Sequence, residues 1–312
     1  MASSQPILLG GPTAVGKSEV APLLAEKLSG EIISVDSMQV YRGMEIGTAK
    51  PTAEQRARAP HHLIDVVEVT ESFDAAQFVR LARQAMTGIQ ARGRIPILCG
   101  GTGLYFKALL EGLGEAPPAD AELRAELEAK ALADLLRELA ERDPVTYEKI
   151  DRQNPRRVIR AVEVIRLTGK PFSAQRADWS RASGITHAPH FFGLSRTSDD
   201  LRKRIDLRVE AMFRRGLVAE TEALLRRGLG ENKTAMQALG YRQVIEHLRG
   251  VRSLSETIEL VKIRTRQFAK RQMTWFRKHA RLHWIAIPTG EPAPLTADQL
   301  LREISGYGER AR

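Results

Sequence analysis

The fold follows from one stretch of sequence, Gly10-Gly11-Pro12-Thr13-Ala14-Val15-Gly16-Lys17-Ser18. From Gly11 to Ser18 it matches G-x-x-x-x-G-K-[ST], the pattern of a phosphate-binding loop. Residues 6–9 before it are apolar and predict a strand, and residues 17–28 after it predict a helix. A plain glycine turn is the alternative interpretation, but the complete motif between a strand and a helix favours a phosphate site.

The chemistry of such a loop is local. Glycines let successive backbone N–H groups curl around an anion, and the following helix adds the positive end of its dipole. Lys17 would bring a full charge to phosphate oxygens, and Ser18 would offer a hydroxyl to Mg²⁺. The predicted phosphate-binding residues are Gly11, Pro12, Thr13, Ala14, Val15, Gly16, Lys17 and Ser18.

Composition narrows the class of protein. The chain has 312 residues, 43% of them hydrophobic, and it contains no apolar run of membrane-spanning length. Residues 1–5 lack the features of a secretory signal, and the single cysteine, Cys99, fits a reducing cytoplasm. Forty-eight Lys and Arg against 38 Asp and Glu give a net charge of +10, which favours a polyanionic partner. We therefore expect a cytoplasmic protein without a membrane segment.

Two further apolar strands are predicted, at 31–35 and 95–99, and each runs into polar residues. Sites in parallel α/β sheets form at the carboxyl ends of strands. Asp36 stands at such an end and is a candidate general base, with a helix or turn cap as the alternative. Thr102, in Gly-Gly-Thr after the second strand, would bring a hydroxyl to the same edge, or would cap the next helix. The pattern predicts an α/β fold, with helices flanking a parallel sheet of the P-loop NTPase type.

Residues 115–189 predict an all-α insertion between core segments 1–114 and 190–312. Residues 122–142 are continuously helix-forming. Further on, Arg156 and Arg160 would share one helix face while Val158 points inward with its apolar neighbours. An arginine cluster suits phosphates, and a solvated face with ion pairs is the alternative.

The C-terminal third is basic. Arg204 and Arg208 lie four apart on a helix predicted at 201–213, and residues 240–243 predict a break that exposes an aromatic side chain and a charge. Residues 262–281 hold eight Lys and Arg and no acid, with Ile263, Phe268, Met273 and Phe276 expected to face inward. This segment could contact RNA or support the active site. Short strands are expected at 62–67, 190–195 and 282–287, and the tail from residue 288 is expected to be peripheral.

Seven blocks, in order over about nine tenths of the chain, resemble the tRNA dimethylallyltransferase (isopentenyltransferase) family. They are Gly-Pro-Thr-Ala-Val-Gly-Lys-Ser (11–18), Asp-Ser-Met-Gln-Val-Tyr-Arg-Gly (36–43), Gly-Thr-Ala-Lys-Pro (47–51), Gly-Gly-Thr-Gly-Leu-Tyr (100–105), Asn-Pro-Arg-Arg-Val-Ile-Arg (154–160), Gly-Tyr-Arg-Gln (240–243) and Lys-Arg-Gln-Met-Thr-Trp (270–275). Their joint occurrence is far more specific than the phosphate loop alone.

The resemblance implies transfer of a dimethylallyl group from dimethylallyl diphosphate to N6 of the adenosine at position 37 of tRNA, with Mg²⁺ held near Ser18. Asp36 would be the base, with Thr102 and Arg208 as further catalytic residues and Arg204 as a diphosphate contact. The insertion would help to clamp the anticodon stem-loop, and a monomer is expected. The implied tRNA contacts are Asp36, Ser37, Met38, Gln39, Thr102, Arg124, Arg156, Arg157, Val158, Ile159, Arg160, Gln237, Gly240, Tyr241 and Arg242.

Two other functions share this core. A small-molecule or nucleotide kinase would need ATP turnover that depends on a small acceptor. A non-catalytic RNA-binding ATPase module would keep its RNA affinity without Asp36. The heavily basic segment near the C-terminus argues against a metabolite kinase.

Overall fold

The computed structural model describes residues 5–175 and 190–310, with side chains up to residue 306. The chain divides into a core unit, residues 1–110 with 184–312, and a helical unit, residues 111–183. The first division falls a few residues before the predicted start of the insertion. The predicted return to the core at 189/190 borders residues 176–189, which are outside the described residues. Within the described residues, no helix has both the length and the apolar character needed to cross a membrane.

The core unit is built on one six-stranded sheet in which every neighbouring pair of strands is parallel. Its strands are β1 (Ile7–Gly10), β2 (Gly30–Val35), β3 (His61–His62), β4 (Ile95–Gly100), β5 (Phe191–Ser195) and β6 (His283–Ala286). Their order is β3-β2-β4-β1-β5-β6, so the two most apolar strands, β4 and β1, are central. The α/β class predicted from the sequence is confirmed.

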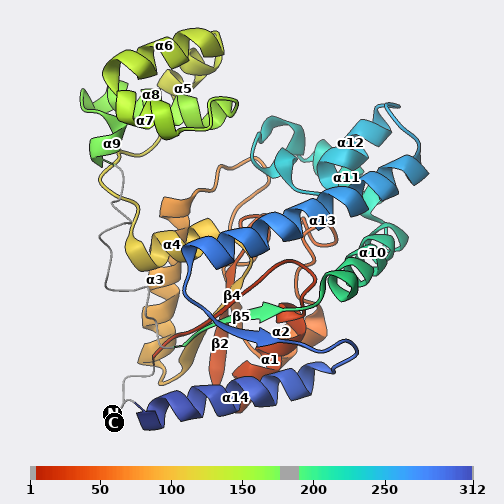
Figure 1. Ribbon diagram of the computed structural model, residues 1–312. Coiled ribbons are helices and arrows are strands. Elements are labelled where there is room, and N and C mark those ends of the chain that lie inside the picture. The colour runs from red at the N-terminus through yellow and green to blue at the C-terminus, as the bar shows by residue number, and fades with distance from the viewer. Residues whose placement is uncertain (1–4, 176–189, 311–312) are drawn as a thin grey trace. The chain divides into compact units, whose positions relative to one another are not determined.

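Helices cover both faces of the sheet (Figure 1). The described helices of this unit are α1 (Lys17–Leu28), α2 (Ala53–Arg58), α3 (Ala75–Ala91), α4 (Gly103–Glu111), α10 (Ser198–Arg214), α11 (Leu217–Arg226), α12 (Tyr241–Leu248), α13 (Leu254–His279) and α14 (Ala293–Arg310), with the 3-10 turns η1 (Leu229–Glu231) and η2 (Ala235–Gln237). One apolar cluster joins α1 and α14 to the sheet, and a larger one joins α3, α4, α11, α12 and α13 to the other face. All strands point their carboxyl ends to one edge, where the phosphate loop after β1 and the turns after β2 and β4 lie.

The helical unit has an apolar core of its own. It contains α5 (Ala121–Glu128), α6 (Leu132–Arg142), α7 (Pro144–Lys149), α8 (Pro155–Thr168) and α9 (Phe172–Gln175). Leucines of α5 and α6 pack against Val158, Val162 and Ile165 of α8. The helix predicted without interruption over 122–142 is wrong: α5 ends at Glu128 and α6 begins at Leu132, capped by Ala131 in an extended conformation.

Three other predictions about elements need correction. The strand predicted at 62–67 stops after His62, because Leu63 and Asp65 have φ angles of 61° and 57°, which no strand accommodates. The tail from residue 288 is not peripheral, since Ala297 and Leu300 of α14 are fully buried in the cluster around α1. On α13 the inward face is shifted from the one expected.

The buried side chains of α13 are those of Thr257, Val261, Ala269, Gln272 and Phe276, whereas Ile263 is 45% exposed. These positions keep the spacing of one helical face, so the helix runs amphipathically over the sheet. Most of its basic side chains face away, and Lys262 and Arg266 pair with Glu210 and Asp206 of α10. The buried polar Gln272 is the exception on the inward face.

Candidate functional site

The phosphate loop joins β1 to α1 and is shaped by its glycines. Gly11 and Gly16 have φ angles of 146° and 116°, in the region that favours glycine. A Cβ on Gly11 would also stand only 2.8 Å from the carbonyl oxygen of Leu194 on β5. The loop therefore lies directly against the neighbouring strand, which fixes its curvature.

The outward carbonyl groups of the loop accept hydrogen bonds from three cations. Lys17 Nζ donates to the carbonyl oxygens of Gly11 (2.9 Å) and Pro12 (2.7 Å). Arg204 Nε and Arg196 Nε donate to the next carbonyls, those of Ala14 and Val15, each at 2.9 Å. This cationic rim adds positive charge around a loop that already presents backbone N–H groups. Sequence reasoning did not single out Arg196, although its place just after β5 was a usable signal.

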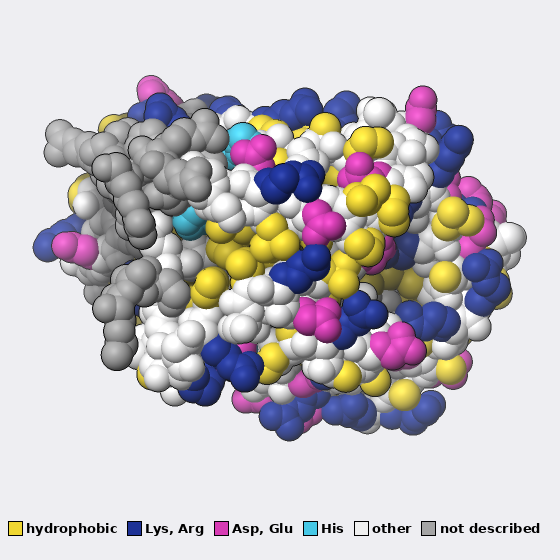
Figure 2. Space-filling model, turned by 90° about the horizontal axis from the view of Figure 1, so that it is seen from below, with side chains coloured by type: hydrophobic (Ala, Val, Ile, Leu, Met, Phe, Trp, Pro, Cys, Tyr) yellow, Lys and Arg dark blue, Asp and Glu magenta, His cyan; other side chains and the backbone are white. Residues whose placement is uncertain are grey.

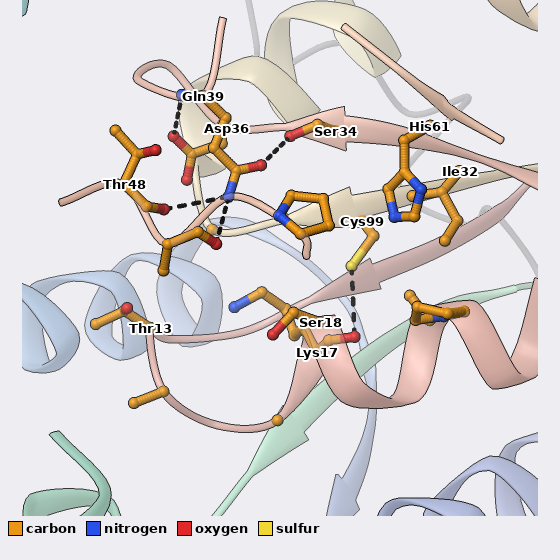
Figure 3. Close-up of a pocket in the computed structure, with 18 of the residues that line it drawn as sticks. Thr13, Lys17, Ser18, Ile32, Ser34, Asp36, Gln39, Thr48, His61 and Cys99 are labelled. Atoms are coloured by element: carbon orange, nitrogen blue, oxygen red, sulfur yellow. Dashed lines mark hydrogen bonds between the residues drawn. The ribbon is translucent and has the colours of Figure 1, made fainter. Parts of the chain in front are cut away.

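A cavity of about 110 Å³ opens beside this loop. Figure 3 shows Lys17, Asp36, Gln39, Thr48 and Cys99 around it. Part of its lining is mainly apolar, with Ala21, Pro22, Ile32, Pro51 and Cys99 beside the imidazole of His61. Lys17, Arg208 and Asp36 supply charged groups to its lining, so one cavity holds groups for an anion, an apolar chain and a proton.

Asp36 follows β2 directly and is partly buried. Its Oδ1 accepts hydrogen bonds from the backbone N–H of Met38 (2.8 Å) and of Gln39 (3.2 Å). It is thus a turn cap and, at the same time, a carboxylate that lines the cavity. Loss of solvation raises the pKa of Asp36, and the two N–H groups and the charges of Lys17 and Arg208 offset only part of that effect.

Two cations face the carboxylate. Burial lowers the pKa of Lys17 to about 8, and the nearby guanidinium of Arg208 contributes in the same direction. Burial also lowers the pKa of Arg208, whose Nη1 donates to Thr13 Oγ1 at 3.2 Å. Arg204, four residues earlier, divides its guanidinium between the loop and Glu19, with 2.6 Å between Nη2 and Oε1. Arg208 therefore lies on the cavity side and Arg204 on the rim.

Thr102 links the two polar strand ends. Its Oγ1 accepts a hydrogen bond from the backbone N–H of Ser37 at 3.2 Å, and its own N–H donates to the carbonyl oxygen of Val35 at 3.2 Å. The hydroxyl is thus used by the turn after β2. This contact joins the turn that carries Asp36 to the start of α4.

Gln272 is a site residue that sequence reasoning missed. From α13, its Oε1 accepts from the backbone N–H of Thr13 (2.8 Å) and its Nε2 donates to the carbonyl oxygen of Gly101 (2.9 Å). It therefore bridges the phosphate loop and the Gly-Gly-Thr loop. A Cβ on Gly101 would come within 2.3 Å of Gln272 Nε2, and one on Gly103 within 2.0 Å of the Trp275 ring. These glycines permit the close approach of α13. The signal was a polar residue on the inward face of the basic helix.

The cavity lining also includes the thiol of Cys99 and the hydroxyl of Ser18. Burial raises the pKa of the Cys99 thiol to about 11, which keeps the thiol protonated, and the partly buried side chain lines the cavity from β4. Among the described residues, no group of three or more His, Cys, Asp or Glu could hold a metal ion. Mg²⁺ commonly binds through one or two protein groups together with phosphate oxygens. The hydroxyl of Ser18, beside Lys17 in the cavity lining, fits such shared coordination.

The predicted tRNA contacts of the core unit fall into two groups. Ser37, Met38 and Gln39 are partly exposed on the turn after β2, and Gln237 and Arg242 are exposed. Tyr241 is fully buried, so the prediction of an exposed aromatic side chain is wrong, and neighbouring Gly240 is buried as well. The excess of basic residues is not concentrated on the face seen in Figure 2, where basic and acidic side chains are interspersed.

In the helical unit, too, some of the predicted tRNA contacts are exposed and others are buried. Arg156 and Arg157 are exposed at the start of α8, whereas Val158 and Ile159 are buried, at 0% and 8% exposure. The side chains of these two apolar residues belong to the core of the unit and cannot contact RNA, which corrects the prediction.

The other two arginines predicted to contact tRNA in this unit, Arg124 and Arg160, face a buried acid. Arg124 Nη2 and Arg160 Nη1 both approach Glu163 Oε2, at 2.6 and 2.7 Å, and the side chain of Glu163 is completely buried. Arg160 Nη2 also donates to the carbonyl oxygen of Pro117. For Arg160, the structure therefore agrees with the alternative interpretation of an ion-paired helix face.

Comparison with known proteins gives one consistent result. Residues 39–279 match the family model described as IPP transferase. The tRNA dimethylallyltransferase 1 of Trichlorobacter lovleyi is 46% identical over 90% of this chain and 93% of its own length. The crystal structure of the tRNA isopentenylpyrophosphate transferase of Bacillus halodurans is similar with a TM-score of 0.70 and 38% identity, covering 99% of both chains. A eukaryotic dimethylallyltransferase acting on tRNA is similar with a TM-score of 0.82 and 28% identity, covering 99% of this chain and 80% of that one.

Proposed function

Because this chain belongs to the IPP transferase family, the family of the tRNA dimethylallyltransferases, we propose that it prenylates tRNA. The donor is dimethylallyl diphosphate, and the acceptor is the exocyclic N6 of the adenosine at position 37, just 3′ of the anticodon. The observation that carries this proposal is one cavity with a phosphate loop, Lys17 and Arg208 against the carboxylate of Asp36, continued by an apolar wall.

The diphosphate is the leaving group in this reaction. The bond between C1 of the prenyl group and the bridging oxygen breaks, and the diphosphate departs with the electron pair. Lys17, Arg208 and the loop N–H groups oppose the charge that develops on it, and a well-placed donor of this kind is worth about 3–4 kcal/mol. The Ser18 hydroxyl would help to hold Mg²⁺, which would supply further positive charge at the diphosphate.

Asp36 acts on the other partner. The N6 amine is a poor nucleophile because its lone pair is delocalised into the adenine ring. As the new N–C bond forms, the amine loses a proton, and Asp36 accepts it. Asp36 can accept a proton only in its ionised form, and burial raises the pKa of this carboxyl group. When the pH is lowered, the transfer rate should therefore begin to fall at a higher pH than it would with an exposed aspartate.

The acceptor base must leave its stack before it reaches the cavity, at a cost of about a few kcal/mol. Exposed Arg156 and Arg157 on the helical unit, and Arg242 and Gln237 on the core unit, are suited to phosphates and splayed bases. The turn of Ser37 to Gln39, with Thr102, would meet the base itself. We further infer a monomer that acts in the cytoplasm, a reducing compartment that the single cysteine fits.

A label-transfer assay tests the proposal. Purified protein receives Mg²⁺, tRNA that lacks the modification, and either dimethylallyl diphosphate labelled in the prenyl group or ATP labelled in the γ-phosphate. We expect prenyl label in tRNA. Asp36→Ala should lower turnover by about 10²–10⁴-fold, the usual contribution of a general base, with little change in tRNA affinity.

Other results would redirect the interpretation. Turnover of ATP that depends on a small acceptor, without prenyl transfer, would make the protein a kinase. Normal turnover in Asp36→Ala would remove the aspartate from the role of base.

A further inference from the structure

A cluster of hydrogen bonds lies where α11 and α12 meet the loop that follows β2. Glu220, on α11, accepts from the backbone N–H groups of Glu45 (3.3 Å), Ile46 (2.9 Å) and Gly47 (3.3 Å). The hydroxyl of Tyr241, at the start of α12, donates to the same carboxylate at 2.6 Å and accepts from Gly47 at 3.1 Å. Four donors thus converge on one charged group, and hydrogen bonds to charged acceptors are the strong ones.

The cluster is closely packed. Tyr241 is fully buried, and a Cβ on Gly47 would stand 2.4 Å from its ring. Burial and the neighbouring carboxylate raise the pKa of Tyr241, so the hydroxyl keeps the proton that it donates. Sequence reasoning assigned Tyr241 to tRNA contact and did not consider Glu220.

The same loop forms one wall of the cavity. Its carbonyl groups at Thr48 and Ala49 accept from Gln39 Nε2, at 3.2 and 3.3 Å, as Figure 3 shows. Gln39 Oε1 accepts from Ser34 Oγ at 2.8 Å, and the backbone N–H of Gln39 donates to Asp36 Oδ1 at 3.2 Å. A continuous chain of contacts therefore runs from Glu220 to the carboxylate of Asp36.

We propose that Glu220 and Tyr241 are positioning residues for prenyl transfer: they fix the loop of residues 45–49, which holds Gln39 and, through it, Asp36. This inference rests on the proposed role of Asp36. Neither residue lines the cavity. Their effect is to keep the base and the cavity wall in one arrangement while the substrates bind.

Single-turnover rates with both substrates saturating test the proposal. Glu220→Gln replaces an acceptor-only group by one that carries N–H donors, which face the loop N–H groups. We expect a rate lower by about 10- to 100-fold, the loss that a small displacement of catalytic groups produces. The dissociation constant of the donor should change less than about twofold, because the phosphate loop is not touched. Tyr241→Phe, which keeps the ring, should show a smaller loss in the same direction.

The matched control is Glu222→Gln, an exposed acid on the same helix, which should leave the rate unchanged. Circular dichroism at the assay temperature checks that each variant is folded. A folded Glu220→Gln enzyme with the rate of the wild type would overturn the proposal.

Two readouts separate positioning from simple stabilisation. Gln39→Ala already interrupts the chain of contacts, so adding Glu220→Gln to this variant should lower the rate only a little further. A double variant whose loss of rate equals the product of the two single losses would contradict the inference. Hydrogen exchange of the amides of residues 45–47 should become faster in Glu220→Gln. Unchanged exchange rates would refute the proposal that Glu220 fixes this loop, even in an inactive preparation. A wild-type protein without transferase activity would instead refute the proposed function.

Discussion

Two pairs of arginines have the same spacing and different uses. Arg204 and Arg208 on α10 both reach the phosphate loop, one at the carbonyl oxygen of Ala14 and the other at the hydroxyl of Thr13. On α8, Arg156 is exposed, and Arg160 is bound to Glu163 and to a carbonyl of its own unit.

The two pairs differ in the groups that lie next to their guanidinium groups. A spacing of four residues places two side chains on one face, but it does not choose their partner. On α10 the facing element is a loop with outward carbonyl groups. On α8 the partner belongs to the helix itself: Glu163, three residues after Arg160, is a fully buried carboxylate that must be neutralised, since an unpaired buried charge is expensive. The charge of Arg208 therefore faces the cavity, whereas the charge of Arg160 is paired with an acid of its own helix.

The largest effect should come from the site pair. Arg208→Ala removes a partly buried donor that lines the cavity, and we expect a decrease in kcat of about 10²–10³-fold, as for loss of a transition-state donor. Arg204→Ala should cost less, because part of that guanidinium pairs with Glu19. Steady-state kinetics with saturating tRNA measure both. Equal losses for the two variants would break the distinction between a cavity arginine and a rim arginine.

Arg160→Ala should act on folding and hardly on catalysis. It leaves Glu163 with Arg124 as its remaining cationic partner, and we expect the free energy of unfolding to fall by about 1–3 kcal/mol. Urea denaturation followed by circular dichroism measures it, with Arg137→Ala, a surface ion-pair residue, as control. Undiminished stability together with much weaker tRNA binding would place Arg160 with the site arginines instead.

Lys17 sharpens the comparison, because it can lose the charge that the arginines keep. Its pKa of about 8 means that the free enzyme deprotonates this residue as the pH rises through that value. Bound diphosphate favours the charged form, so donor affinity should fall by up to about tenfold per pH unit above that pKa. Calorimetric titrations at several pH values test this. Lys17→Met should bind weakly at every pH, without that slope.

The smallest effect should come from the exposed end of α8. Arg157→Ala removes one exposed charge, and we expect tRNA affinity to fall a few-fold and the slope of log affinity against log salt to become shallower by about 1. Filter binding across a range of salt concentrations measures both. An unchanged slope would mean that this arginine meets solvent and not a phosphate.

The parts of the site that could be predicted from sequence are local. The phosphate loop, Asp36 and Thr102 each lie at a strand end, where a short motif and the geometry of parallel sheets determine the neighbourhood. Arg196, Gln272 and Glu220 were missed because their partners are remote: Gln272 bonds a residue 259 positions earlier, and Arg196 one 181 positions earlier. A glutamine or a glutamate of ordinary local context carries no sign of such a partner.

Other errors arose where a block was carried over as a whole. The run from Arg156 to Arg160 resembles a tRNA-contacting segment, yet helical periodicity already placed Val158 inward, and the structure confirms that orientation. Tyr241 shows the same conflict between a motif and the need to bury an aromatic ring. The prediction of a peripheral tail was wrong for a different reason. The apolar face of α14 is recognisable only beside the α1 surface that it covers.

That last helix has a consequence for synthesis. Val20 and Leu24 of α1, just behind the phosphate loop, are buried in the same cluster as Ala297 and Leu300. The phosphate loop and α1 are synthesised long before α14, so the helix that supports the loop stays uncovered until α14 has left the ribosome. The helical unit, whose core is drawn from residues 123–172, can fold well before that moment. A nascent chain should therefore fold its helical unit before the support of its phosphate loop is complete.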